Sequence, residues 1–118
     1  MPKLRVLIAD DERPARLFLK NLLNGFEDVE VVGEAKDGAE VLDLIKEIKP
    51  DLLLLDLQMP VLRGLEVFKL LPENNAFFVV FVTADEAKAA QIFEAGSFEY
   101  LLKPVAQAQL RAVVNKAK

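Results

Sequence analysis

Short, continuous apolar runs alternate along the chain with longer stretches in which apolar residues recur at helical spacing. The runs predict five buried strands, over Leu4–Ala9, Val29–Val32, Leu52–Leu55, Phe77–Val82 and Phe98–Leu102. The third run is apolar at four consecutive positions. Both faces of that strand should therefore be covered, which places it inside a sheet.

The stretches between the runs predict amphipathic helices over 15–23, 39–48, 65–71, 86–95 and 106–117. Pro14 suits a first helical turn, and Asn24-Gly25 is expected to supply a left-handed stop. The second helix must end before Pro50. Because strand and helix alternate five times, we expect an α/β fold, a doubly wound parallel sheet with helices on both faces.

Composition is consistent with one domain that spans residues 1–118. The chain has 118 residues, of which 53% are hydrophobic and 29% charged. No apolar run approaches the roughly 20 residues of a membrane span, and the N-terminus lacks the apolar core of a secretion signal, so we expect a cytoplasmic protein with no membrane partner.

Cysteine and histidine are both absent from the sequence. Disulfides, thiolate chemistry and cysteine-based zinc sites are therefore excluded, as is the commonest general base. Any chemistry must use carboxylate, amine or hydroxyl groups. The formal net charge of -4 does not favour direct binding of nucleic acid, and we interpret the basic stretch 111–118 as a solvated helix end.

Polar residues follow four of the predicted strands. Asp10 and Asp11 follow the first strand, Asp56 ends the third, Thr83 ends the fourth and Lys103 ends the fifth. Any one aspartate after a strand could be only a helix cap or a turn residue. Ligands of open parallel sheets, however, bind beyond the carboxyl ends of the strands, so all five side chains should converge on one edge.

Three carboxylates at one edge repel one another, so the fold must raise the pKa of one of them or bind a cation. Mg²⁺ prefers a few oxygen ligands and keeps several waters, which suits Asp11, Asp56 and a backbone carbonyl, with Asp10 acting directly or through a water. Calcium is the alternative ion, but the chain has no oxygen-rich EF-hand loop.

A carboxylate can attack phosphorus and form an aspartyl phosphate when cations neutralise the phosphoryl oxygens. Asp56 is the candidate nucleophile, and Lys103 is placed to be one of those cations. Thr83 adds a hydroxyl donor, and the small Ala84 leaves room for the group to enter.

Four segments together resemble the receiver domain of two-component response regulators, and the likeness covers essentially the whole chain: VLIADDE, PDLLLLDLQMPVLRGLE, FVVFVTA and FEAGSFEYLLKPV. The resemblance implies a flavodoxin-like (βα)5 fold with strand order 2-1-3-4-5. It also implies that a histidine kinase or phosphotransfer protein phosphorylates Asp56 in the presence of Mg²⁺. The implied metal site comprises Asp10, Asp11, Asp56 and the backbone carbonyl of Gln58, and the implied phosphoryl ligands are Thr83 and Lys103.

The same resemblance implies a regulatory phosphoacceptor rather than an enzyme, with Thr83 and Tyr100 as a switch pair. The last strand, the last helix and the helix before them would contact an output domain or a second receiver. The resemblance also suggests a cis Lys103-Pro104 bond. A weaker likeness of residues 80–105 to receivers attached to LytTR-type DNA-binding domains suggests the N-terminal part of a transcriptional regulator.

Three other functions share parts of this pattern. A haloacid-dehalogenase-type phosphatase also uses an aspartyl nucleophile, but it needs a second acid two residues later, where this chain has Gln58. A flavodoxin needs a hydroxyl- and glycine-rich phosphate loop after the first strand, where this chain has DDERPAR. A degenerate receiver could act as an interaction module without phosphate, but the five polar residues are intact.

Overall fold

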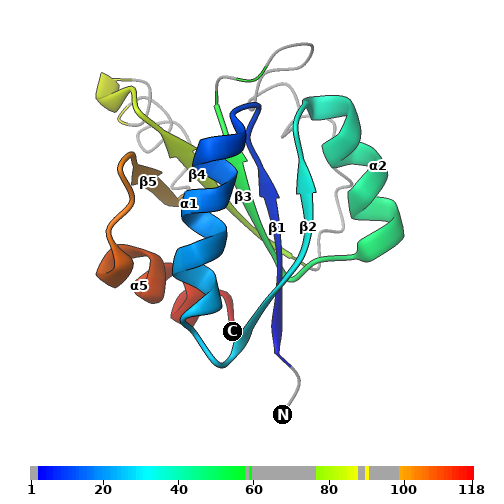
Figure 1. Cartoon of the computed structure of the whole chain (residues 1–118), viewed down its shortest axis with the longest axis horizontal. Coiled ribbons are helices and arrows are strands. Elements are labelled where there is room, and N and C mark those ends of the chain that lie inside the picture. The colour runs from blue at the N-terminus through cyan, green and yellow to red at the C-terminus, as the bar shows by residue number, and fades with distance from the viewer. Residues whose placement is uncertain (1–2, 58, 60–76, 88–89, 91–98) are drawn as a thin grey trace.

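The computed structural model describes residues 3–57, 59, 77–87, 90 and 99–118. Within them the chain forms a five-stranded parallel sheet with strand order β2-β1-β3-β4-β5 (Figure 1). The strands are β1 (Leu4–Ala9), β2 (Val29–Ala35), β3 (Leu52–Asp56), β4 (Phe78–Thr83) and β5 (Glu99–Leu102). The predicted fold class and strand order are confirmed.

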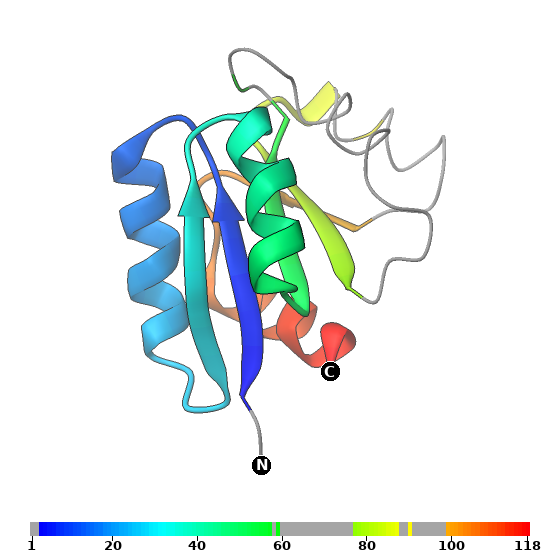
Figure 2. The ribbon, with the colours of Figure 1, turned by 90° about the vertical axis from the view of Figure 1, so that its right-hand side faces the viewer.

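Helices cover both faces of the sheet. Helices α1 (Arg13–Asn24) and α5 (Gln107–Ala117) lie on one face, and α2 (Gly38–Ile48) lies on the other (Figures 1 and 2). Glu86, Ala87 and Ala90 are also helical. Three predictions lie outside the described residues. They are the helix 65–71, the rest of the helix 86–95, and Phe98 as the first residue of the fifth strand.

The core consists of two apolar layers because alternate strand residues point to opposite faces of the sheet. In β3, Leu52 and Leu54 pack in the layer under α1 and α5, whereas Leu53 and Leu55 pack in the layer under α2. All four leucines are fully buried, as their continuous apolar run predicts. A rigid central strand therefore carries Asp56 to the edge of the sheet.

The first helix does not end as the sequence suggests. Gly25 has a φ of -76°, so the left-handed stop predicted at Asn24-Gly25 is wrong. Instead, the N–H groups of Gly25 and Phe26 bond to the carbonyls of Leu22 and Leu23, and this tight turn needs no positive φ. Among the residues that the structure describes, the left-handed one is Lys49 after α2, with a φ of 53°.

Strand β2 continues beyond the predicted Val32 to Ala35. The register shifts between Val6 and Leu7 of β1, after which Gly33, Glu34 and Ala35 pair with residues 7–9. This extra pairing extends β2 as far as Ala9, the last residue of β1. As a result, the polar side chain of Glu34 reaches the carboxyl edge of the sheet beside the end of β1.

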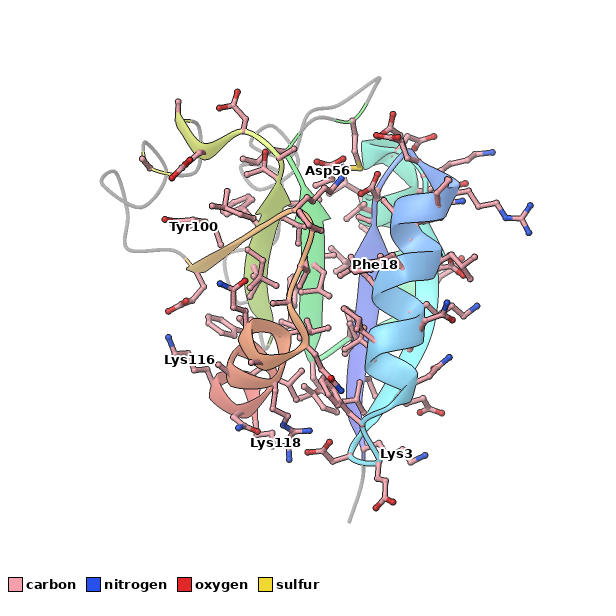
Figure 3. The ribbon with its side chains drawn as sticks, turned by 60° about the vertical axis from the view of Figure 1, so that its left-hand side comes forward. Lys3, Phe18, Asp56, Tyr100, Lys116 and Lys118 are labelled. Carbon is pink, nitrogen blue, oxygen red and sulfur yellow. The ribbon has the colours of Figure 1, made fainter. Side chains whose placement is uncertain are left out.

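The C-terminal helix is held by ion pairs at the amino edge of the sheet. Arg111 on α5 donates to both carboxylate oxygens of Asp28 at 2.7 and 2.5 Å, and its guanidinium lies 4.9 Å from the ring centroid of Phe26. Lys118 also pairs with Asp28. Figure 3 shows Lys118 at the end of the molecule opposite Asp56. Three cations of the basic stretch 111–118 thus have carboxylate partners, since Lys116 pairs with Glu99 at 2.6 Å.

We expect this cluster to stabilise the fold in a pH-dependent way. Hydrogen bonds from Arg111 and Lys118 lower the pKa of Asp28 well below its ordinary value. A lowered pKa stabilises the fold above the pKa of the unfolded carboxyl, about 4, and this contribution is lost as the pH falls through the folded pKa. In urea titrations, Asp28→Asn should therefore lower the free energy of unfolding at neutral pH, by an amount that shrinks in acid.

Asp43→Asn is the matched control, because Asp43 is exposed on α2 and forms no ion pair among the described residues. It should leave the unfolding curve nearly unchanged at every pH. A cost of Asp28→Asn that stays constant from neutral to acid pH would contradict the assigned role of the Asp28 carboxylate.

Candidate functional site

Three carboxylates meet at the carboxyl edge of the sheet. Asp10, Asp11 and Asp56 each offer an oxygen atom, and these atoms lie within 4.8 Å of one another. Asp10 and Asp56 are 1% and 4% exposed, whereas Asp11 is open to solvent. The cluster is thus a largely buried acidic pocket with one accessible side.

Strand pairing brings these acids together. The backbone N–H of Asp10 donates to the carbonyl of Ala35 at 3.0 Å, so the residue after β1 is still held by β2. Asp56 lies opposite Val82 in the β3–β4 register, and the N–H of Leu57 continues the pairing to the Val82 carbonyl at 3.3 Å. Because Ala9 of β1 pairs with Leu55 of β3, the residues that follow them, Asp10 and Asp56, lie side by side.

Lys103 neutralises part of the acidic charge. Its Nζ lies 2.7 Å from Asp10 Oδ2 and 3.7 Å from Asp56 Oδ2. Its backbone N–H donates to the carbonyl of Thr83 at 2.8 Å, so the end of β5 stays attached to β4. The following Lys103-Pro104 bond is cis, as the resemblance suggests.

The charge on Lys103 is favoured in this position. Burial opposes the charge of the ammonium group, but the hydrogen bond to Asp10 and the fields of Asp56, Asp10 and Glu12 outweigh it, so the pKa of Lys103 is raised above its ordinary value. Lys103 is therefore a permanent cation at neutral pH. Its ammonium group lies close enough to pair with two carboxylates, Asp10 after β1 and Asp56 at the end of β3.

Thr83 lies buried at the end of β4 with its hydroxyl oxygen accepting a hydrogen bond. The donor is the N–H of Asp85, 3.0 Å away. Because a hydroxyl can donate and accept at once, the Thr83 proton is still able to donate to an oxygen of a bound group. The next residue, Ala84, is exposed and small.

Comparison with known proteins identifies this arrangement. Residues 6–115 match the family described as response regulator receiver domain. The chain belongs to this family. The transcriptional regulatory protein BtsR of Salmonella typhi is 38% identical over 115 residues, which are 98% of this chain and 48% of the relative. An uncharacterized response regulatory protein of Vibrio vulnificus is 42% identical over 113 residues, 96% of this chain and 47% of the relative.

The structural comparison agrees with the sequence comparison. The response regulator domain of CheB from Thermotoga maritima superposes with a TM-score of 0.84 at 30% sequence identity, over 98% of this chain and 96% of that one. The chain spans about half the length of the curated relatives that it matches. Within the described part of this receiver domain, no helix is long and apolar enough to cross a membrane.

The structure brings together most of the predicted site residues of the receiver domain. Asp10, Asp11, Asp56 and Lys103 form one cluster, whereas Gln58 lies outside the described residues. Tyr100 lies on β5 opposite Phe81, two positions before Leu102, which pairs with Thr83. It is half-buried against the α2 side of the core, apart from Asp56 (Figure 3).

Sequence reasoning missed two residues beside this cluster. The Arg16 guanidinium donates to the backbone carbonyl of Asp10 at 2.7 Å and to Glu34 Oε1 at 3.2 Å. Glu12 donates its N–H to Asp10 Oδ1 at 2.9 Å. The Glu12 contact is a local turn between residues two apart, of the kind that an aspartate after a strand commonly forms. The Arg16 contact with Glu34 has no local sequence signal, because it depends on how α1 packs beside the extended end of β2.

Proposed function

We propose that residues 1–118 act as one receiver domain in which Asp56 accepts a phosphoryl group with the help of Mg²⁺. The observation that carries this proposal is the meeting of three carboxylates within 4.8 Å, with the Lys103 ammonium 3.7 Å from Asp56. A buried carboxylate with a cation on one side and an open acidic partner on the other suits attack on phosphorus. The chain would then be a regulator that is phosphorylated, not a turnover enzyme.

The donor set of the cluster fits Mg²⁺. All three side chains offer carboxylate oxygens, and the exposed side at Asp11 leaves room for waters. Asp11 and Asp56 are the proposed direct ligands, with the Gln58 carbonyl as a further one. Both Asp10 oxygens already accept hydrogen bonds, which favours a contact of Asp10 through water. Bound there, Mg²⁺ would offset the negative charge that the phosphoryl group brings.

In the proposed transfer, Asp56 is the acceptor, and Lys103 and Thr83 are the side chains that stabilise the transferred group beside Mg²⁺. An oxygen of Asp56 forms a bond to phosphorus while the bond between phosphorus and a kinase histidine nitrogen breaks. Lys103 then lies beside the new phosphoryl oxygens, and the Thr83 hydroxyl donates to one of them. The added charge of about -1.5 to -2 is the physical signal.

We propose that this signal passes from Thr83 to Tyr100 and changes the surface of β5 and α5. A hollow between these two elements is lined by residues that include Tyr100, Leu102 and Val113. An output domain or a second receiver is the proposed partner of this face. Only Glu86, Ala87 and Ala90 of the preceding helix are described, so the share of that helix in the face is a prediction.

The proposed phosphodonor is a histidine kinase or phosphotransfer protein in the cytoplasm. Because BtsR is named as a transcriptional regulatory protein, we further propose that this receiver controls a transcriptional output. The LytTR type of that output is a prediction from sequence. The acidic pocket itself is not a nucleic acid site, since it would repel phosphates that lack a metal.

The decisive test is uptake of one phosphoryl group. With a small phosphodonor and Mg²⁺, intact mass should rise by one phosphoryl group, and without Mg²⁺ the reaction should be slower by orders of magnitude, as expected when a metal stabilises the transferring group. Beryllium fluoride with Mg²⁺ should shift the amide resonances of residues 56, 83 and 103.

Two results would contradict the proposal. Unchanged mass and unchanged spectra would favour an interaction module without phosphate. Repeated release of phosphate from an exogenous phosphoester, with many turnovers per protein, would favour the phosphatase alternative.

A further inference from the structure

Arg16 connects the acidic pocket to the edge strand of the sheet. It lies in the second turn of α1, and its side chain is only 15% exposed. One nitrogen donates to the Asp10 carbonyl at 2.7 Å, and another donates to Glu34 Oε1 at 3.2 Å. The planar guanidinium thus joins the end of β1 to the end of β2.

Glu34 anchors this contact from the other side. Its second oxygen accepts a hydrogen bond from Lys20 at 3.2 Å. Burial works against the negative charge of Glu34, but Lys20 and Arg16 outweigh burial and lower the pKa of its carboxyl. Glu34 is therefore ionised at neutral pH, and it holds the Arg16 guanidinium in one orientation.

The carbonyl that Arg16 binds belongs to the peptide unit between Asp10 and Asp11. A peptide unit is planar, so the direction of its carbonyl also sets the direction of the Asp11 N–H and the position of the Asp11 Cα. Within the described part of the chain, the Asp11 carboxylate forms no hydrogen bond or ion pair of its own. Its position thus depends on the backbone that carries it.

We infer that Arg16 is a positioning residue for the metal site, which places the Asp11 carboxylate by fixing the Asp10–Asp11 peptide plane. The inference rests on the proposed Mg²⁺ site. Residues that orient metal ligands commonly change metal affinity by about 10- to 100-fold when they are replaced. Because Arg16 acts through the backbone, we expect the lower end of that range.

Arg16→Lys is the most informative variant because it keeps the positive charge and removes the fork of donors. A single ammonium cannot reproduce the two-sided geometry that joins a carbonyl and a carboxylate. We expect Mg²⁺ affinity, measured by NMR titration, to fall by about tenfold. In the metal-free protein, the amide resonances of residues 11 and 12 should shift as well. If charge alone matters, neither quantity changes.

Lys20→Ala is the matched control, because it removes the other ion pair of Glu34 and leaves the Asp10 carbonyl contact in place. It should bind Mg²⁺ like the wild type and leave the amide of residue 11 unshifted. Urea unfolding of both variants establishes that each is folded under the titration conditions. Equal weakening by both variants, or wild-type affinity in Arg16→Lys, would overturn the role of Arg16.

Failure of the proposed function gives a different result. If the wild type itself does not bind Mg²⁺, the metal site is wrong. The amide shifts of the metal-free variants then still decide whether Arg16 fixes the peptide plane, because that measurement needs no metal.

Discussion

Asp56→Asn is expected to abolish phosphoryl uptake. An amide oxygen carries no full negative charge and cannot form a stable acyl phosphate, so the variant loses the nucleophile and keeps the shape of the residue. Asp56 is 4% exposed, and its backbone lies in register with Val82 of the neighbouring strand β4. The fold should therefore tolerate the change. Intact mass after incubation with a small phosphodonor and Mg²⁺ should stay that of the unmodified chain.

Asp51→Asn provides a control immediately before the other end of β3. The Asp51 carboxylate accepts the N–H of Arg5 at 2.9 Å, a contact that an asparagine oxygen can also make. This variant should take up one phosphoryl group as the wild type does. Full uptake by Asp56→Asn would show that another residue accepts the group and would remove Asp56 from its proposed role.

Lys103→Met is expected to destabilise the metal-free protein on the order of 2–3 kcal/mol. Removing one partner of a buried ion pair leaves the other charge uncompensated, which commonly costs about 3–5 kcal/mol. We expect somewhat less because the Lys103 side chain is 24% exposed and methionine keeps its apolar length. Asp10 and Asp56 would then repel each other without a cation between them. Urea unfolding without divalent ions measures the effect.

Mg²⁺ should restore much of the stability that Lys103→Met loses. The variant lacks the ammonium that competes for the same carboxylates, so it should gain more from Mg²⁺ than the wild type gains. Its phosphoryl uptake should nevertheless be slow, because the variant has lost the Lys103 ammonium that lies 3.7 Å from Asp56 Oδ2 in the wild type.

Lys116→Met is the control for the loss of a lysine ion pair. Lys116 pairs with Glu99 at 2.6 Å, but its side chain is 56% exposed, and exposed pairs contribute about 0–1 kcal/mol. A similar cost for both lysines would mean that Lys103 does not compensate buried charge. If Mg²⁺ stabilises Lys103→Met no more than it stabilises the wild type, the idea that Lys103 and Mg²⁺ compete for the same carboxylates is wrong.

The order of strands and helices follows from local sequence, because strands appear as continuous apolar runs and helices as apolar residues at helical spacing. The four consecutive leucines of β3 require cover on both faces of the strand. The polar residues after the apolar runs mark the ends of β1, β3, β4 and β5, whereas β2 continues past its predicted end. Since the carboxyl ends of parallel strands share one edge, the convergence of Asp10, Asp56 and Lys103 also follows from sequence. The site was therefore predictable to the level of which residues meet.

The partners of those residues were decided only by the tertiary structure. Lys103 bonds to Asp10 at 2.7 Å and lies farther from Asp56, a preference that depends on where β5 ends relative to β1. The Arg16 contact requires the shifted register that carries Glu34 to the edge of the sheet. Local periodicity specifies elements and the ends of strands, whereas register and ion pairs arise from packing between segments distant in sequence.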